Sequence, residues 1–176
     1  MPLHICFAHG KESGPWGNKG QLLSRIARER GHEYSALNYL SCEQPDNPES
    51  RVKMLTEYLT EMQVPSEELV LIGSSMGGYV AARASQQFPA AGIFLMAPAF
   101  GLTQYPMQWP ELNSTHIHII HGLFDSTIPW MNSNQVSQNT GCALHLLSDD
   151  HRLTDSINVI EEDFIAFLEP LEQALP

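Results

Sequence analysis

Short apolar runs alternate along the chain with longer segments in which apolar residues recur every three or four positions. The short runs have the length and continuous hydrophobicity of parallel strands buried on both faces, and the longer segments read as amphipathic helices. This alternation predicts an α/β fold: a three-layer α/β/α sandwich with a mainly parallel six-stranded sheet. The strands are expected at residues 3–8, 33–39, 69–73, 92–97, 116–121 and 143–147.

Helix boundaries are indicated by capping residues, glycines and prolines. The first helix is expected at 21–30, before Gly31, and the second is expected to start at Pro48 behind the cap Asn47 and to end before Pro65. The third is expected to run from about 75 to 88, and the fourth from about 129 to 141. The last carries an apolar stripe from 157 to 168, and we expect Pro170 to end it.

Composition narrows the class of protein. The 176 residues include 20 acidic and 9 basic side chains, a net charge of −11, and we expect one acidic domain over 1–176. Because the chain has no basic run, neither a nucleic acid nor a membrane surface is an expected partner. The three cysteines show no paired spacing, and no targeting or membrane-spanning segment is recognisable, so we expect no disulfide and a cytoplasmic location.

The strand at 69–72 leads directly into Gly-Ser-Ser-Met-Gly at 73–77, and a helical segment follows without a gap. This is the pattern G-x-S-x-G in the strand–turn–helix context of a nucleophile elbow, which exposes a serine hydroxyl at the edge of a sheet. The pattern centres on Ser75, because centring it on Ser74 would require glycine at Ile72 and Met76. The alternative is a tight or phosphate-binding turn, which would need neither an acid nor a histidine.

The acid and the histidine of such a site follow the serine in chain order. Asp125 comes after the strand at 116–121, and His151 comes after the strand at 143–147, so both are expected at the carboxyl edge of the sheet. Asp149 and Asp150 compete for the acid role, but as sequence neighbours of His151 we expect them to shape its loop.

The other histidines receive no catalytic role. Strand alternation directs His116 and His118 to one face of the sheet and His121 to the other, so the three do not form a zinc site. His4, His32 and His145 are interpreted as strand or surface residues. We expect the site to need neither a metal nor an organic cofactor.

The glycine-rich segment at 9–17 follows the first strand and is expected to help stabilise an oxyanion. Its donor would be the backbone N–H of Lys11, and the second donor would be the N–H of Met76. One alternative is that His9-Gly10 is a plain tight turn. Another is that the Lys11 side chain attracts an anionic substrate. Aromatic residues in nearby loops either line an acyl pocket or cover the core; the pocket candidates are Trp16, Phe100, Tyr105, Trp109 and Trp130.

With GSSMGG at 73–78, HGLFD at 121–125 and DHRL at 150–153, the sequence resembles the α/β-hydrolase superfamily over almost its whole length. HGKESGP at 9–15 and the small size are similar to the cap-less bacterial esterases and thioesterases and to the retinoblastoma-binding serine hydrolase group. The resemblance implies Ser75, Asp125 and His151 as a catalytic triad that hydrolyses a carboxylic ester or thioester.

Two departures from that superfamily bear on specificity. Lys11 stands where the lipase-like H-G-G-G loop has glycine, and only the segment 99–115 occupies the place of a lid domain, so at most a partial flap is expected. We therefore expect an open site for a small or flexible acyl group, with activity falling as pH drops through the range in which imidazole is protonated, about 6.5. The alternatives are an aminopeptidase or amidase with the same triad, and a binding protein on a hydrolase scaffold.

Overall fold

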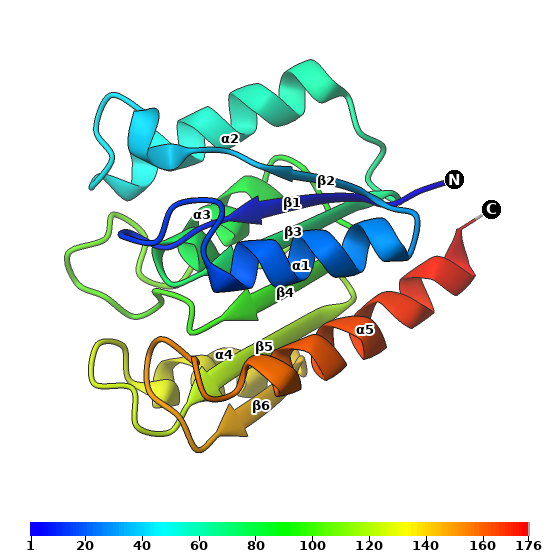
Figure 1. Ribbon diagram of the computed structural model, residues 1–176. Helices are drawn as coiled ribbons and strands as arrows, with labels where there is room; N and C mark the ends of the chain where they lie inside the picture. The colour runs from blue at the N-terminus through cyan, green and yellow to red at the C-terminus, as the bar shows by residue number, and fades with distance from the viewer. Residues whose placement is uncertain (176) are drawn as a thin grey trace.

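The computed structural model describes residues 1–175, and within them six strands form one parallel sheet. The strands are β1 (His4–Ala8), β2 (Glu33–Ala36), β3 (Leu69–Ser74), β4 (Gly92–Met96), β5 (Ile117–Gly122) and β6 (Ala143–Leu147). Their order across the sheet is β2-β1-β3-β4-β5-β6, and every neighbouring pair is parallel (Figure 1). The predicted six-stranded sheet is therefore confirmed.

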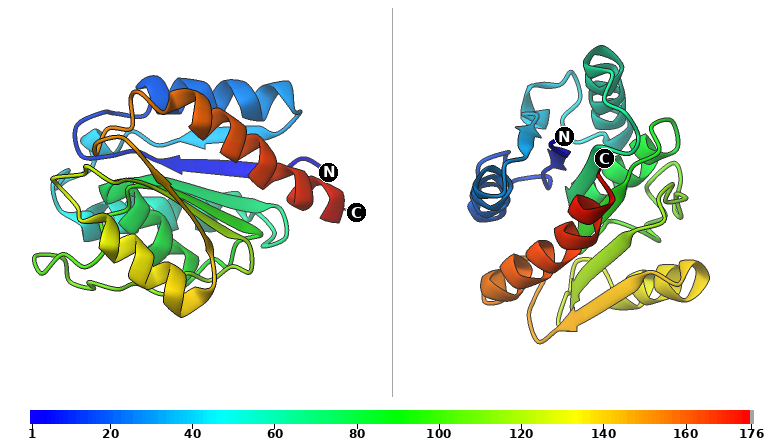
Figure 2. Two further views of the ribbon diagram at one scale, coloured as in Figure 1. Left: turned by 90° about the horizontal axis from the view of Figure 1, so that it is seen from below. Right: turned by 90° about the vertical axis from the view of Figure 1, so that its right-hand side faces the viewer.

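Helices cover both faces of this sheet. They are α1 (Asn18–Glu29), α2 (Pro48–Met62), α3 (Met76–Ser85), α4 (Trp130–Thr140) and α5 (Ile157–Ala174), with a short 3-10 helix, η1 (Tyr39–Ser41). Helices α1 and α5 lie on one face, and α2, α3 and α4 lie on the other (Figure 2). Each face encloses its own hydrophobic cluster, one containing Phe94 and Phe164 and the other Leu71 and Tyr79. The predicted three-layer sandwich is confirmed.

The chain order reverses between β1 and β3: the connection from β1 leads outward to β2, and β3 then returns to the other side of β1. Loops that leave the carboxyl ends of β1 and β3 consequently diverge and leave room between them, which is where open α/β sheets bind ligands. Both strands are buried, apart from Ser74 at the end of β3. Residues at the carboxyl ends of β1 and β3, where the chain order reverses, are therefore held by buried strands and lie at an accessible edge of the sheet.

The structure corrects the predicted end of the last helix. Helix α5 continues through Pro170 to Ala174, although proline has no N–H for the carbonyl one turn earlier. The carbonyl that loses its donor is that of Ala166. The helix continues because its last turn is packed: Leu171 is buried in the core, and His116 Nε2 donates to the neighbouring Phe167 carbonyl oxygen at 2.9 Å, which attaches this part of α5 to the sheet. Burial of the last turn against the core therefore outweighs the hydrogen bond that Pro170 removes.

Three smaller boundaries also differ from the sequence prediction. Helix α1 begins at Asn18, three residues before the expected start at 21. Strand β2 ends at Ala36 rather than at 39, because the chain turns into η1 and buries the Tyr39 ring. Helix α3 ends at Ser85, three residues before Phe88. The chain after β2 lies at the carboxyl edge of the sheet, where the Tyr39 amide donates to His9 Nε2 at 3.0 Å.

The segment 99–115 contains no helix or strand and lies against α3. Phe100 is fully buried, Tyr105 packs edge-on against Tyr79 with ring centroids 4.8 Å apart, and the Met107 sulfur accepts from Arg83 at 3.6 Å. The segment is therefore anchored at several points along its length. Among residues 1–175, none of the helices combines the length and apolar character needed to cross a membrane, and the three cysteines are free thiols.

Candidate active site

Ser75 occupies a sharp turn between β3 and α3. Its backbone angles are φ 56° and ψ −120°, a conformation that non-glycine residues rarely adopt and that is typical of strained functional turns. The flanking glycines make the turn possible. A Cβ on Gly77 would lie 1.8 Å from the Ala8 carbonyl oxygen, and one on Gly73 would lie 2.3 Å from the Gly77 carbonyl oxygen. The turn consequently holds the Ser75 hydroxyl at the exposed edge.

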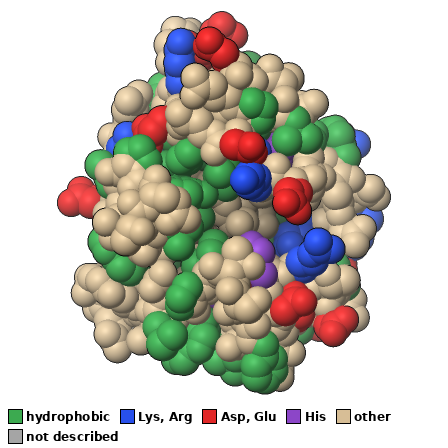
Figure 3. All heavy atoms as spheres, turned by 90° about the vertical axis from the view of Figure 1, so that its left-hand side faces the viewer, with side chains coloured by type: hydrophobic (Ala, Val, Ile, Leu, Met, Phe, Trp, Pro, Cys, Tyr) green, Lys and Arg blue, Asp and Glu red, His purple; other side chains and the backbone are tan. Residues whose placement is uncertain are grey.

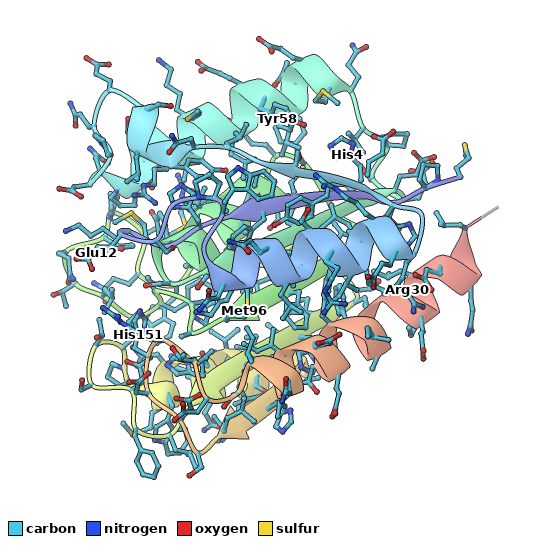
Figure 4. All side chains as sticks on the ribbon, in the orientation of Figure 1. His4, Glu12, Arg30, Tyr58, Met96 and His151 are labelled. Atoms are coloured by element: carbon cyan, nitrogen blue, oxygen red, sulfur yellow. The ribbon has the colours of Figure 1, made fainter. Side chains whose placement is uncertain are left out.

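Three loops bring the serine, the histidine and the aspartate together. Ser75 Oγ lies 2.9 Å from His151 Nε2, and His151 Nδ1 lies 2.7 Å from Asp125 Oδ2. Because a carboxylate only accepts, Nδ1 carries the ring proton, and the lone pair of Nε2 faces the serine hydroxyl. Figure 4 shows His151 at the end of the sheet to which the strand arrows point.

Asp125 is the most enclosed of the three residues, with no exposed side-chain surface. Its Oδ1 accepts the backbone N–H groups of Thr127 and Ile128, both at 2.8 Å. Burial raises the pKa of Asp125, but the hydrogen bonds from Ile128 and His151 outweigh burial, and its pKa lies below the ordinary aspartate value. The carboxylate is therefore charged at neutral pH and aimed at His151.

His121 is a site residue that the sequence analysis did not identify. Its Nε2 lies 3.0 Å from both Asp125 Oδ2 and the Ile128 carbonyl oxygen, and its Nδ1 lies 2.7 Å from Ser133 Oγ. Both partners of Nε2 are acceptors, so Nε2 carries the proton and Nδ1 accepts from the serine hydroxyl. Burial lowers the pKa of His121 despite its contacts with the Ile128 carbonyl and Asp125, so the ring is a neutral support beneath Asp125. The one feature of the sequence that could have indicated this contact is the position of His121 at the end of a strand, four residues before Asp125.

The two neighbouring aspartates accept hydrogen bonds from other groups of their own loop. Asp149 accepts from the Ser156 amide at 2.9 Å and from the Ser156 hydroxyl at 2.7 Å, and Asp150 accepts from the Arg152 amide at 2.8 Å. These bonds shape the loop that carries His151.

Arg51 is a second residue that the sequence analysis missed. Its fully buried guanidinium donates to the carbonyl oxygens of His9 at 3.2 Å, Gly10 at 3.1 Å, Lys11 at 3.2 Å and Pro45 at 2.6 Å. These bonds turn the carbonyls of the loop after β1 toward α2. Nothing in the sequence around 51 distinguished this arginine from one on the exposed side of a helix.

The predicted oxyanion donors are the amides of Lys11 and Met76. Neither amide donates to a backbone carbonyl within residues 1–175. Met76 is the first residue of α3, where an N–H has no partner inside the helix and the helix dipole favours negative charge. The Lys11 ammonium lies 3.7 Å from the Asp46 carboxylate, and both are well exposed, so this pair contributes little to stability.

The predicted pocket aromatics lie in different surroundings. Trp16 is half-exposed in a groove along α1, Phe100 is fully buried, and Tyr105 packs on α3. Trp109 is 40% exposed, and Trp130 is partly buried at the start of α4.

Figure 3 views the carboxyl edge of the sheet and shows histidine atoms in a hollow bordered by hydrophobic, basic and acidic side chains.

Comparison with known proteins gives a family match for more than half of the chain. The model of an uncharacterised protein family, UPF0227, matches residues 4–109. The rice protein named "Probable esterase PIR7A", from Oryza sativa subsp. indica, is 33% identical over an alignment of 109 residues that covers 56% of this chain and 41% of the rice protein. The match thus spans less than half the length of that relative.

Solved structures resemble the fold over nearly the whole chain. A protein of the alpha/beta hydrolase superfamily from Xanthomonas campestris pv. campestris is 29% identical, with a TM-score of 0.84 and coverage of 98% of this chain and 99% of that one. A second Xanthomonas campestris protein, described as a serine hydrolase without lid, is 17% identical, with a TM-score of 0.75 and coverage of 100% and 84%. The latter likeness concerns the fold alone. None of these matches bears on the retinoblastoma-binding group, and that resemblance stays a prediction.

Proposed function

Because the chain belongs to the uncharacterised protein family UPF0227 and to the small lid-less hydrolases of the α/β-hydrolase superfamily, we propose that it is a serine hydrolase acting on a carboxylic ester or thioester. The observation that carries the proposal is the hydrogen-bonded chain from Ser75 through His151 to Asp125. The esterase name of the rice relatives supports an ester as substrate.

In the proposed mechanism, Ser75 Oγ attacks the carbonyl carbon while His151 Nε2 takes the hydroxyl proton. The amides of Lys11 and Met76 donate to the resulting oxyanion. When the tetrahedral intermediate collapses, the bond to the leaving group breaks, and His151 returns the proton to the departing alcohol or thiol. Water then repeats the two steps and releases the acyl group as a carboxylic acid.

Asp125 has a supporting part in this mechanism. It holds His151 in the tautomer with Nδ1 protonated and stabilises the imidazolium that forms in each half-reaction. Two backbone amides hold Oδ1 of the carboxylate, and His121 donates to Oδ2, the oxygen that also accepts from His151. Because Asp125 is buried and charged, it supplies this stabilisation with little reorganisation during the reaction.

The experiment that tests the proposal combines covalent labelling with turnover. We expect a fluorophosphonate probe to label the wild-type protein and Ser74→Ala, but not Ser75→Ala. Because Ser74 is the adjacent serine in the same turn, it is a matched control for folding and for unspecific labelling. Asp125→Asn is expected to lower kcat by about 10⁴-fold, the size of effect typical for loss of this carboxylate. Labelling of Ser75→Ala would show that the nucleophile is wrong.

Parallel assays of acyl esters, acyl thioesters and aminoacyl amides, each with increasing acyl length, distinguish the substrate classes. The proposal requires turnover of esters or thioesters, fastest for short or flexible acyl groups. Turnover of amides alone would make the protein an amidase. A wild-type protein that neither labels nor hydrolyses any of these substrates would be a binding protein with a hydrolase fold.

A further inference from the structure

Two histidines and one aspartate meet on the face of the sheet that α5 covers, outside the proposed active site. His118 is on β5, His145 is on β6, and Asp163 is on α5. Asp163 Oδ2 lies 3.1 Å from His118 Nε2 and 2.6 Å from His145 Nδ1. One oxygen and two ring nitrogens, all within 4.8 Å of one another, thus converge on one point.

Strand register explains why these residues converge. His118 pairs with Ala143, and Ile120 pairs with His145, so the two histidines are diagonal neighbours on one face of adjacent parallel strands. Helix α5 packs on that face through Phe164 and its neighbours, which brings Asp163 over both rings. The three residues are far apart in the sequence, and the pairing of β5 with β6 together with the packing of α5 brings them together.

The cluster borders a surface cleft of about 660 Å³ at the amino-terminal end of β5 and β6. His118, Asp163 and Cys142 line this cleft. The side chains of His118 and Asp163 are 20% and 18% exposed, and that of His145 is 43% exposed. An ion can therefore reach the cluster from solvent, while the protein encloses most of its ligand atoms.

The ring of His118 is held in a defined orientation. It stacks on Phe94 with centroids 5.2 Å apart and an interplanar angle of 6°, and Phe94 itself is fully buried. This support fixes the direction of Nε2, as packing around the ligands of protein metal sites commonly does. A preformed ligand loses little conformational entropy when a metal ion binds.

We propose that His118 Nε2, His145 Nδ1 and Asp163 Oδ2 bind a zinc ion, with water from the cleft completing its coordination. Two ligands held tetrahedrally at about 2.0–2.1 Å from zinc are about 3.3 Å apart. The separations of 3.1 and 2.6 Å from Asp163 Oδ2 differ from that value by less than 1 Å, and the two ring nitrogens, which lie within 4.8 Å of one another, need to approach by at most about 1.5 Å. Imidazole nitrogens favour zinc over calcium and magnesium, which prefer oxygen ligands. On binding, the proton of each ring nitrogen that now faces Asp163 moves to the other nitrogen of the ring.

This zinc site is separate from the proposed triad. His118 is four residues before the end of β5, about 13 Å along the strand from the carboxyl edge. The ion would join β5, β6 and α5 at the edge of the sheet. Its loss is therefore expected to lower thermal stability while leaving labelling of Ser75 unchanged.

Zinc binding to the chelator-treated full-length protein tests the proposal. We expect one equivalent of zinc per chain at micromolar protein concentration in competition with a chromophoric chelator, and the visible bands of tetrahedral Co²⁺ when cobalt replaces zinc. Each of His145→Gln and Asp163→Asn is expected to weaken binding at least about 100-fold, since changes outside the ligand set alone cost 10–100-fold.

His4→Gln is the matched control. His4 is also a strand histidine paired with a carboxylate, with Nδ1 2.9 Å from Glu33 Oε2, but it is not part of the three-residue cluster. It is expected to bind zinc like the wild type. Circular dichroism of the metal-free variants checks that each is folded. Of the two replacements, His145→Gln is expected to disturb folding less, because the His145 side chain is more exposed than that of Asp163. If the wild type binds no zinc, or if both ligand variants bind it unchanged, the cluster is a hydrogen-bonded clamp and the proposal is wrong.

Discussion

The nucleophile and its two partners are held by different physical means. The Ser75 turn is built from steric contacts: glycines at 73 and 77 leave space for backbone carbonyls, and β3 beneath them is buried. Asp125 and His151 are held by hydrogen bonds, from two backbone amides, from His121 and between their own side chains. The Ser75 turn thus requires residues without a Cβ, whereas Asp125 and His151 require hydrogen-bond donors around the carboxylate.

This difference predicts how each side responds to change. A steric turn tolerates no added atom, because the contacts behind it belong to backbone that cannot move aside. A hydrogen-bonded support weakens in steps as single donors are removed, and it responds to pH. The predictions below test this contrast, beginning with the largest effect.

Gly77→Ala is expected to destabilise the protein by more than about 4 kcal/mol, because its Cβ would lie 1.8 Å from the Ala8 carbonyl oxygen. Urea unfolding and soluble yield measure the effect. Gly31→Ala, at a glycine with φ 82° and open space around it, is the control and is expected to cost about 1 kcal/mol. Similar stability of the two variants would contradict the steric account of the turn.

Arg51→Met is expected to cost about 3 kcal/mol, because it leaves several buried carbonyls of the loop after β1 without a donor. We also expect kcat/KM to fall at least about tenfold, since this loop carries the Lys11 amide. Arg25→Met removes an exposed arginine paired with Glu161, and we expect it to leave stability and kcat/KM close to wild type because solvent screens such a pair. Full activity of Arg51→Met would mean that the loop keeps its geometry without the guanidinium.

His121→Leu is expected to lower kcat by about 10- to 100-fold with little change in KM, because Asp125 loses a donor that positions it while the substrate contacts remain. Fluorophosphonate labelling is expected to slow in proportion. Ser133→Ala removes only the hydroxyl that donates to His121 and should have a smaller effect. Loss of stability with unchanged kcat would reduce His121 to a structural residue.

The pH dependence of stability gives the smallest expected effect. Burial lowers the pKa of His121, so between the ordinary histidine value of about 6.5 and the lower folded value the unfolded chain binds more protons than the folded one. Stability from this residue is therefore complete above about pH 6.5 and declines as pH falls, by up to about 1.4 kcal/mol per unit. Urea unfolding at pH 7.5 and 5.5 should show a steeper decline for wild type than for His121→Leu. Equal declines would mean that another group causes the effect.

The sequence by itself determined the fold class, the position of the strands and the residues proposed to act. These features depend on short-range physics: hydrophobic periodicity, the glycines that a sharp turn requires, and the chain order of residues at consecutive strand ends. The pattern at 73–77 could be centred on Ser75 alone, and Asp125 and His151 followed strands that were predictable. The end of α5 could not be placed in this way, because burial of Leu171 against the core outweighs the local effect of Pro170.

Only the tertiary structure decided which remote groups support those residues. Arg51 reaches the loop after β1 from α2, and His121 meets Ser133 on α4. The cluster of His118, His145 and Asp163 exists because adjacent strands share one register and α5 crosses them. Periodicity assigns a side chain to a face of its own element, but lateral register and packing determine which side chains from other elements it meets.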